Sequence, residues 1–85
     1  MSLSGDANEI SNALSQAILS ALPGSKVEVI LGSPGHYSLR VHSQLFAEKS
    51  LLAKQRLVFS AITELMAGDQ APVHAIDKLE TLLPD

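Results

Sequence analysis

The amino-acid sequence predicts a small α+β domain with the element order α-β-β-α-β and a possible terminal helix, in which helices cover a three-stranded sheet. Two long segments repeat apolar residues at helical intervals, and three shorter segments have the pattern of strands. The chain has 85 residues, of which 46% are hydrophobic and 18% charged, as expected for one folded domain. We expect this domain to span residues 6–85, and residues 1–5 to be a disordered or cloning-derived N-terminal segment.

The first helix is predicted to begin at Asp6 and to end at Pro23-Gly24. Asp6 and Glu9 have the spacing of a capping box, and the Pro-Gly pair ends the helical pattern. Apolar residues between these limits recur at intervals of three and four, namely Ile10, Ala13, Leu14, Ala17, Ile18, Ala21 and Leu22.

Two strands of one hairpin follow. Residues 27–31 and 37–41 place an apolar side chain at every second position, which is the pattern of half-buried strands. The segment between them, Gly32-Ser33-Pro34-Gly35, consists of residues that favour turns.

A second helix is predicted over residues 50–67, ending at Gly68-Asp69, and a third strand over residues 72–76. The third strand should run parallel to the second, because a β-α-β connection within one sheet is almost always parallel. Residues 77–83 fit either a continued strand or a capped helical turn. Gln55 interrupts the apolar side of the second helix, which is expected to consist of Leu51, Leu52, Val58, Phe59, Ile62, Leu65 and Met66.

Composition excludes several classes of function. The chain has no cysteine, so disulfides, thiol catalysis and an all-cysteine metal site are excluded. A net charge of -3 argues against nucleic-acid binding driven mainly by phosphate contacts. Neither an apolar run of about 20 residues nor a signal-peptide pattern occurs. We therefore expect a soluble, cytoplasmic protein that does not act at a membrane.

The sequence offers little support for an enzyme. It contains neither a glycine-rich phosphate loop nor a nucleophile elbow. Asp77 and Glu80 would be neighbours on a helix, but an acidic pair of this kind is usually a solvated surface. We expect no catalytic residues.

The candidate binding residues are histidines and a group of basic residues. A single histidine is more often structural or solvated than functional. Residue type alone therefore does not support a binding role for His36, His42 or His74. A candidate nucleic-acid patch consists of Arg40, Lys49, Lys54 and Arg56. A solvated helix face is the simpler interpretation, since no aromatic residues alternate with these cations for base stacking.

The order of short motifs between His36 and Ile76 resembles the BolA family. This region reads HYSLRVHSQLFAEKSLLAKQRLVFSAITELM, then a short loop, then VHAI. The family pattern is His-aromatic-x-Val/Leu-x-Val-x-Ser, then Phe-x-Gly-Lys, then a helix with His-Arg-x-Val-Tyr, then Val-His-Ala-Leu. The chain departs from it at Glu48 in place of glycine, at Gln55 in place of histidine, and in its ending DKLETLLPD.

The resemblance implies a fold related to the class II KH module without that module's Gly-x-x-Gly loop. It also implies a heterodimer with a monothiol glutaredoxin that shares a [2Fe-2S] cluster, with no cluster expected in the isolated protein. In such complexes glutaredoxin and glutathione supply thiolates, and the BolA-like partner supplies two further ligands. The histidine of Val-His-Ala corresponds to His74. The ligand from the loop between the first two strands corresponds to His36.

Imidazole ligands would lower the negative charge of the cluster and raise its reduction potential, as in Rieske centres. This would suit a role in cluster transfer or in sensing. If the third strand is parallel to the second, His36 and His74 lie toward the same end of the sheet. His42 is expected to be a solvated strand position.

Two other functions remain open at this point. The family's associations with transcription and the stress response suggest a nucleic-acid-binding regulator. A plain interaction domain that docks to a sulfur-transfer or assembly protein is the third possibility.

Overall fold

The computed structural model describes residues 6–85, so the expectation for residues 1–5 lies outside the described part of the chain. The predicted α-β-β-α-β order is confirmed. The third strand begins at Ala75, three residues later than predicted, and residues 77–82 continue it, so the helical alternative for this segment is wrong. The elements are α1 (Ala7–Ala21), β1 (Lys26–Leu31), β2 (His36–His42), the short 3-10 helix η1 (Gln44–Phe46), α2 (Leu51–Ala61), α3 (Thr63–Met66) and β3 (Ala75–Leu82).

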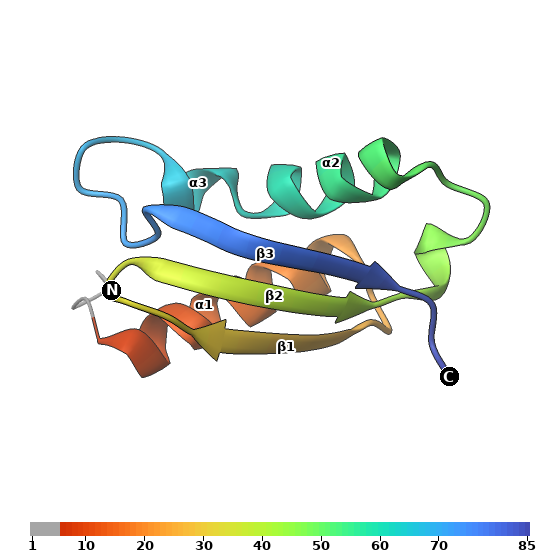
Figure 1. Cartoon of the computed structure of the whole chain (residues 1–85), viewed down its shortest axis with the longest axis horizontal. Helices are drawn as coiled ribbons and strands as arrows, with labels where there is room; N and C mark the ends of the chain where they lie inside the picture. The colour runs from red at the N-terminus through yellow and green to blue at the C-terminus, as the bar shows by residue number, and fades with distance from the viewer. Residues whose placement is uncertain (1–5) are drawn as a thin grey trace.

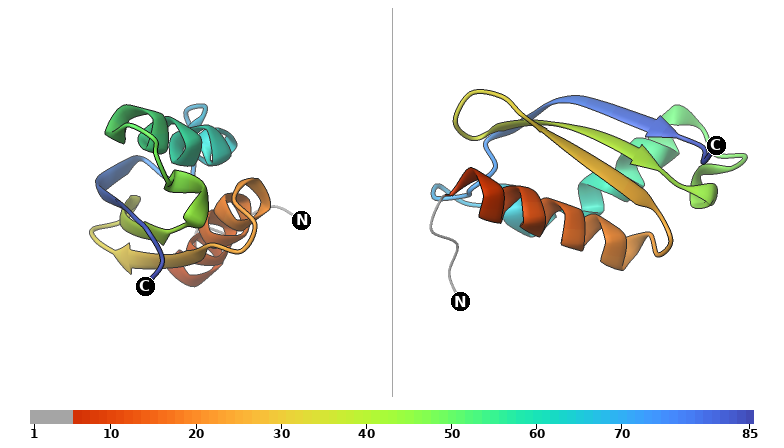
Figure 2. Two further views of the ribbon diagram at one scale, coloured as in Figure 1. Left: turned by 90° about the vertical axis from the view of Figure 1, so that its right-hand side faces the viewer. Right: turned by 90° about the horizontal axis from the view of Figure 1, so that it is seen from below.

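The helices pack on one face of the sheet and leave the other face open (Figures 1 and 2). Strand β2 shows this division directly, because buried and half-buried residues alternate along it. Its buried residues, Tyr37, Leu39 and Val41, face the helices and join the core. The opposite side of β2 carries His36, Ser38, Arg40 and His42.

Strand β2 lies in the middle of the sheet, between β1 and β3. It pairs antiparallel with β1, with Val29 opposite Leu39. It pairs parallel with β3, with His36 opposite Ala75, which confirms the predicted direction of the third strand. The letters Gly-x-x-Gly do occur at residues 32–35, where they form the turn between β1 and β2.

Helix α1 follows the sequence prediction closely. The Asp6 carboxylate accepts hydrogen bonds from the backbone N–H groups of Asn8 and Glu9, at 2.7 and 3.4 Å, and so caps the first turn. The apolar face turns inward and buries Ile10, Leu14 and Ile18. Among residues 6–85, none of the helices combines the length and apolarity that a membrane span requires.

The second predicted helix differs from expectation in two ways. It is interrupted at Ile62, which separates α2 from α3. Leu51, Leu52 and Phe59 were expected in the core but are 60%, 55% and 39% exposed. A helix packed on a sheet buries only one narrow stripe. That stripe is centred on the fully buried Val58 and Ile62.

Candidate functional site

His36 and His74 lie at the same end of the sheet, as the parallel pairing predicted. His36 begins β2, and His74 immediately precedes β3. The backbone carbonyl of Gly35 accepts hydrogen bonds from the N–H groups of both His74 and Ala75, at 2.8 and 3.2 Å. Gly35 therefore ties the two histidine-bearing segments together.

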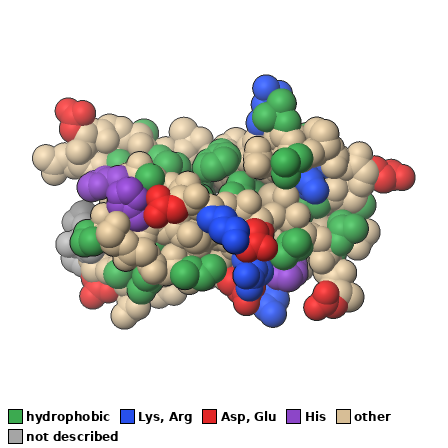
Figure 3. Space-filling model, viewed as in Figure 1, with side chains coloured by type: hydrophobic (Ala, Val, Ile, Leu, Met, Phe, Trp, Pro, Cys, Tyr) green, Lys and Arg blue, Asp and Glu red, His purple; other side chains and the backbone are tan. Residues whose placement is uncertain are grey.

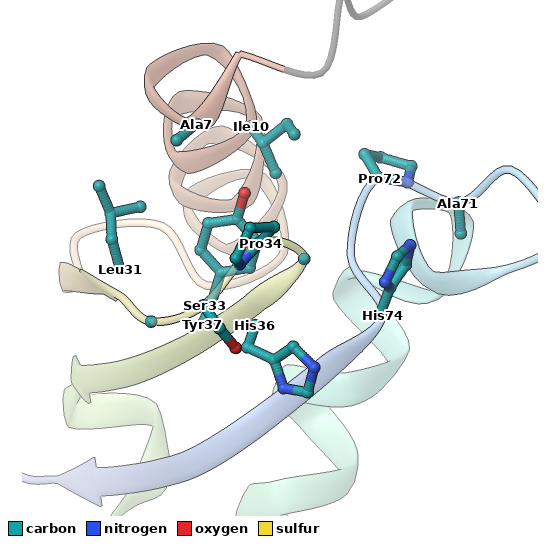
Figure 4. A pocket seen from close by; sticks show the side chains of 12 residues that line it. Ala7, Ile10, Leu31, Ser33, Pro34, His36, Tyr37, Ala71, Pro72 and His74 are labelled. Atoms are coloured by element: carbon teal, nitrogen blue, oxygen red, sulfur yellow. The ribbon is translucent and has the colours of Figure 1, made fainter.

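A pocket of about 490 Å³ adjoins the two histidines. Figure 4 shows His36 coming from the start of β2 and His74 from the segment before β3. The rest of the pocket comes from the hairpin turn, the first turns of α1 and the segment before β3, with lining residues that include Ile10, Leu31, Pro34, Tyr37 and Pro72.

Tyr37 gives this pocket a buried aromatic wall. The residue is 3% exposed, and in Figure 4 its hydroxyl points toward the start of α1. Burial raises the pKa of Tyr37 above its ordinary value of 10.0, and the negative charge of Asp6 raises it further. Tyr37 is therefore a neutral phenol at physiological pH.

His36 has a side-chain partner that the sequence did not reveal. Its Nδ1 atom lies 2.9 Å from Oδ1 of Asp77. An ionised carboxylate only accepts hydrogen bonds, so the imidazole nitrogen that faces it must carry the proton. In the neutral ring, Nε2 of His36 then keeps a free lone pair for a ligand.

Asp77 reaches His36 because it is the extra residue of a β-bulge. The pairing of β2 with β3 steps from Tyr37 opposite Ile76 to Ser38 opposite Lys78, which leaves Asp77 outside the register. Asp77 and Lys78 are both exposed. The residues on either side, Ile76 and Leu79, pack against the core.

His74 is positioned by the backbone of Gly35. Gly35 has φ +80°, and a methyl group at this position would lie 2.6 Å from Nδ1 and 2.8 Å from Cγ of His74. Glycine is therefore required both for the turn and for the approach of the ring. His74 itself is an exposed residue.

The described residues do not complete a metal site by themselves. Within residues 6–85, no group of three or more His, Asp or Glu side chains is arranged to hold a metal ion. His36 and His74 supply imidazoles at one end of the sheet, and the Asp77 carboxylate is hydrogen-bonded to His36. This donor set fits a metal group for which a second molecule provides the remaining ligands.

His42 lies at the opposite end of β2 and does not take part in this site. The expected solvated position is only partly observed, because the side chain is 19% exposed. Its Nε2 atom lies 3.5 Å from Oε2 of Glu28 on the neighbouring strand.

The predicted basic patch is divided between two faces of the molecule. Arg40 lies on the open face of the sheet, because alternation along β2 turns it away from the helices. There its guanidinium contacts Glu28 at 3.6 Å and Glu80 at 3.3 Å. Its inclusion in the patch was therefore wrong. Lys49 lies just before α2, and Lys54 and Arg56 lie on it two positions apart, so these two project from different sides of the helix. None of the three has an ion pair within the described residues.

Asp77 and Glu80 do not form the acidic pair that a helix would have created. Both lie on β3, and each carboxylate has its own partners. Asp77 contacts His36, whereas Glu80 contacts Arg40 and Lys78. Figure 3 shows a His beside an acidic side chain at the end where β2 and β3 begin, and mixed charges over the middle of the sheet.

The comparison with protein families decides the identity. A family model described as BolA-like protein matches residues 10–84. The chain belongs to the BolA-like family. This result confirms the resemblance given by the motifs between His36 and Ile76.

Solved structures agree with the family assignment. A Bol-like protein from Babesia bovis is 31% identical, with a TM-score of 0.66 over 87% of this chain and 84% of the other. The BolA1 protein of Mus musculus is 28% identical, with a TM-score of 0.67 over 99% and 72%. A BolA-like protein from Rickettsia prowazekii is 24% identical, with a TM-score of 0.65 over all of both chains, and supports the fold. Among curated proteins, none matches this BolA-like sequence.

Sequence reasoning missed two residues of this BolA-like site. Asp77 is separated from His36 by 41 positions, and no spacing rule foretells the bulge that brings them together. Gly35 was identified only as a turn residue, although its lack of a side chain also makes room for His74. The sequence signal for this role is that Gly35 stands immediately before the candidate ligand His36.

Proposed function

We propose that this BolA-like protein is a non-enzymatic adaptor that binds a monothiol glutaredoxin. Together with glutathione, the two proteins would share a [2Fe-2S] cluster in iron–sulfur trafficking or in iron and redox regulation. The observation that carries the proposal is that His36 and His74 lie at one end of the sheet, where the backbone of Gly35 links their two segments.

In this proposal His36 and His74 provide two nitrogen ligands, and the partner and glutathione provide thiolates. The cluster, when bound, supplies one-electron redox chemistry at a potential that nitrogen ligands raise. Asp77 holds His36 by its Nδ1 atom, and the backbone of Gly35 supports the ring of His74.

The test is reconstitution with a monothiol glutaredoxin, glutathione, iron and sulfide. We expect a heterodimer whose visible absorption and circular dichroism differ from those of the cluster on glutaredoxin alone. The His74→Ala variant should lose this difference, whereas His42→Ala should keep it, because His42 lies at the other end of β2. A wild-type chain that forms no such complex would refute the proposal.

A nucleic-acid-binding regulator is the second candidate, and one observation favours it. Lys49, just before α2, and Arg56, on α2, line one pocket, and neither they nor Lys54 have an ion pair within residues 6–85. Binding driven by these residues would weaken with salt, with a slope of about 0.9 per neutralised phosphate on duplex DNA. A slope near zero, or no change when all three residues are replaced by alanine, would reject it.

Docking to a sulfur-transfer or assembly protein without a shared metal predicts a different result. Partner binding would then be unchanged in both His36→Ala and His74→Ala. Pull-down of the glutaredoxin with these two variants, with and without iron and sulfide, separates this case from the adaptor.

A further inference from the structure

We infer that Asp77 is a positioning residue, which holds the His36 ring by Nδ1 and thereby presents Nε2 as the ligand atom to the shared metal group. The inference rests on the proposed function for its ligand, but its structural part concerns the chain alone. Its basis is the 2.9 Å contact between His36 Nδ1 and Asp77 Oδ1.

The bulge in β3 makes this contact possible. In an uninterrupted parallel ladder, Asp77 would take the place next to Ser38 and would form part of the regular pairing. The extra residue instead leaves Asp77 beside His36 and lets Lys78 resume the ladder. Bulges commonly redirect a side chain in this way next to functional sites.

The hairpin turn supports the same arrangement from the other side. The N–H of Gly32 donates a hydrogen bond to the backbone carbonyl of His36 at 2.9 Å. A Cβ at Gly32 would lie 3.7 Å from Oδ2 of Asp77, so the carboxylate packs close to the turn. His36 and Asp77 are therefore held between the β1–β2 turn and the bulge of β3.

A histidine binds a metal through one ring nitrogen, and the hydrogen bond at the other nitrogen selects which one. A carboxylate at Nδ1 fixes the proton there and leaves Nε2 for the metal. His74 has no comparable side-chain hydrogen bond within the described residues, and its Nδ1 faces the backbone of Gly35. The two candidate ligands are thus held by different contacts. A carboxylate orients the ring of His36, whereas backbone contact orients the ring of His74.

The first test uses the protein alone and needs no cluster. Long-range ¹H–¹⁵N correlation spectra of the neutral histidines report which nitrogen of His36 carries the proton. We expect Nδ1–H in the wild type, and a shift toward Nε2–H in Asp77→Ala. Asp69→Ala removes another exposed carboxylate, on the turn after α3, and should leave the spectrum unchanged. Nε2–H in the wild type, or no change in Asp77→Ala, would overturn the inference.

The second test uses the complex with glutaredoxin. Loss of a residue that supports a metal ligand typically weakens metal binding 10–100-fold, so Asp77→Ala should release the cluster at least about 10-fold faster than Asp69→Ala. The same change made in a His36→Ala background should have no further effect. An equal effect in both backgrounds would mean that Asp77 acts on the fold and not through His36, and would overturn the positioning role.

These experiments separate the two claims. A wild-type chain that forms no cluster overturns the proposed function and the ligand role of His36 with it. If the cluster forms and its release rate is the same in Asp77→Ala as in Asp69→Ala, only the positioning role is overturned. Circular dichroism of Asp77→Ala checks that the exposed bulge tolerates the change.

Discussion

The ring of His74 lies against the backbone of Gly35, the residue immediately before His36. The contact is so close that even a methyl group on Gly35 would come within 2.6 Å of Nδ1 of His74. The carbonyl of the same glycine accepts the N–H of His74 at 2.8 Å. One glycine therefore sets the positions of both candidate ligands.

Replacing Gly35 by alanine should disturb the site more than the fold. Gly24 is the matched control, because its φ is +81° and nothing lies within 4 Å of the added Cβ. We expect both Gly35→Ala and Gly24→Ala to lose about 1–2 kcal/mol of stability, the cost of a left-handed conformation for an L-residue. Urea unfolding measures that loss.

Only Gly35→Ala should shift the ring resonances of His74 and weaken cluster retention with glutaredoxin. Equal cluster retention in Gly35→Ala and Gly24→Ala would contradict the importance of this contact.

The core and the solvent side of the helices should respond very differently to alanine. Leu14 of α1 is 0% exposed, whereas Leu52 of α2 is 55% exposed. We expect Leu14→Ala to lower the free energy of unfolding by about 2–5 kcal/mol, since it leaves a cavity in the core. Leu52→Ala should change it by less than about 0.5 kcal/mol. Comparable losses in urea unfolding would show that the solvent face of α2 is wrongly assigned.

Much of this fold was predictable because the periodicity of the sequence matches its elements. The alternation along β2, the Asp6 cap and the apolar stripe of α1 each agree with local propensity and with the final packing. The β-α-β handedness rule then placed β3 parallel to β2, and with it His74 at the same end as His36.

The parts that were missed depend on three-dimensional context. Leu52 and Phe59 follow the apolar pattern, yet α2 has no second layer to cover them. Arg40 was grouped with Lys54 by charge alone, although alternation along β2 places it on the other face. Asp77 depends on an insertion in the strand pairing, which residue type does not signal.

The charge cluster on the open face of the sheet predicts a pH effect. A hydrogen bond from Arg40 is the main cause that lowers the pKa of Glu80 below its ordinary value of 4.5. Because the folded carboxylate holds its charge to lower pH than the unfolded one, its stabilising effect is complete above pH 4.5 and is lost as pH falls through the lowered pKa.

The Glu80→Gln variant removes this contribution. The difference in melting temperature between wild type and Glu80→Gln should therefore narrow as the pH is lowered below 4.5. Glu64→Gln, an exposed carboxylate on α3, serves as the control for a general charge effect. A gap that stays constant with pH would argue against a charged Arg40–Glu80 contact.

The central claim is that His36 and His74 bind the shared cluster through their ring nitrogens. The most direct measurement labels only the histidines of this chain with ¹⁵N, assembles the complex with unlabelled glutaredoxin and glutathione, reduces the cluster and records pulsed EPR spectra. We predict strong ¹⁵N hyperfine couplings from two imidazoles, one lost in His36→Ala, the other in His74→Ala, and neither in His42→Ala. A reduced cluster with no strong ¹⁵N coupling in the wild-type complex would contradict the account.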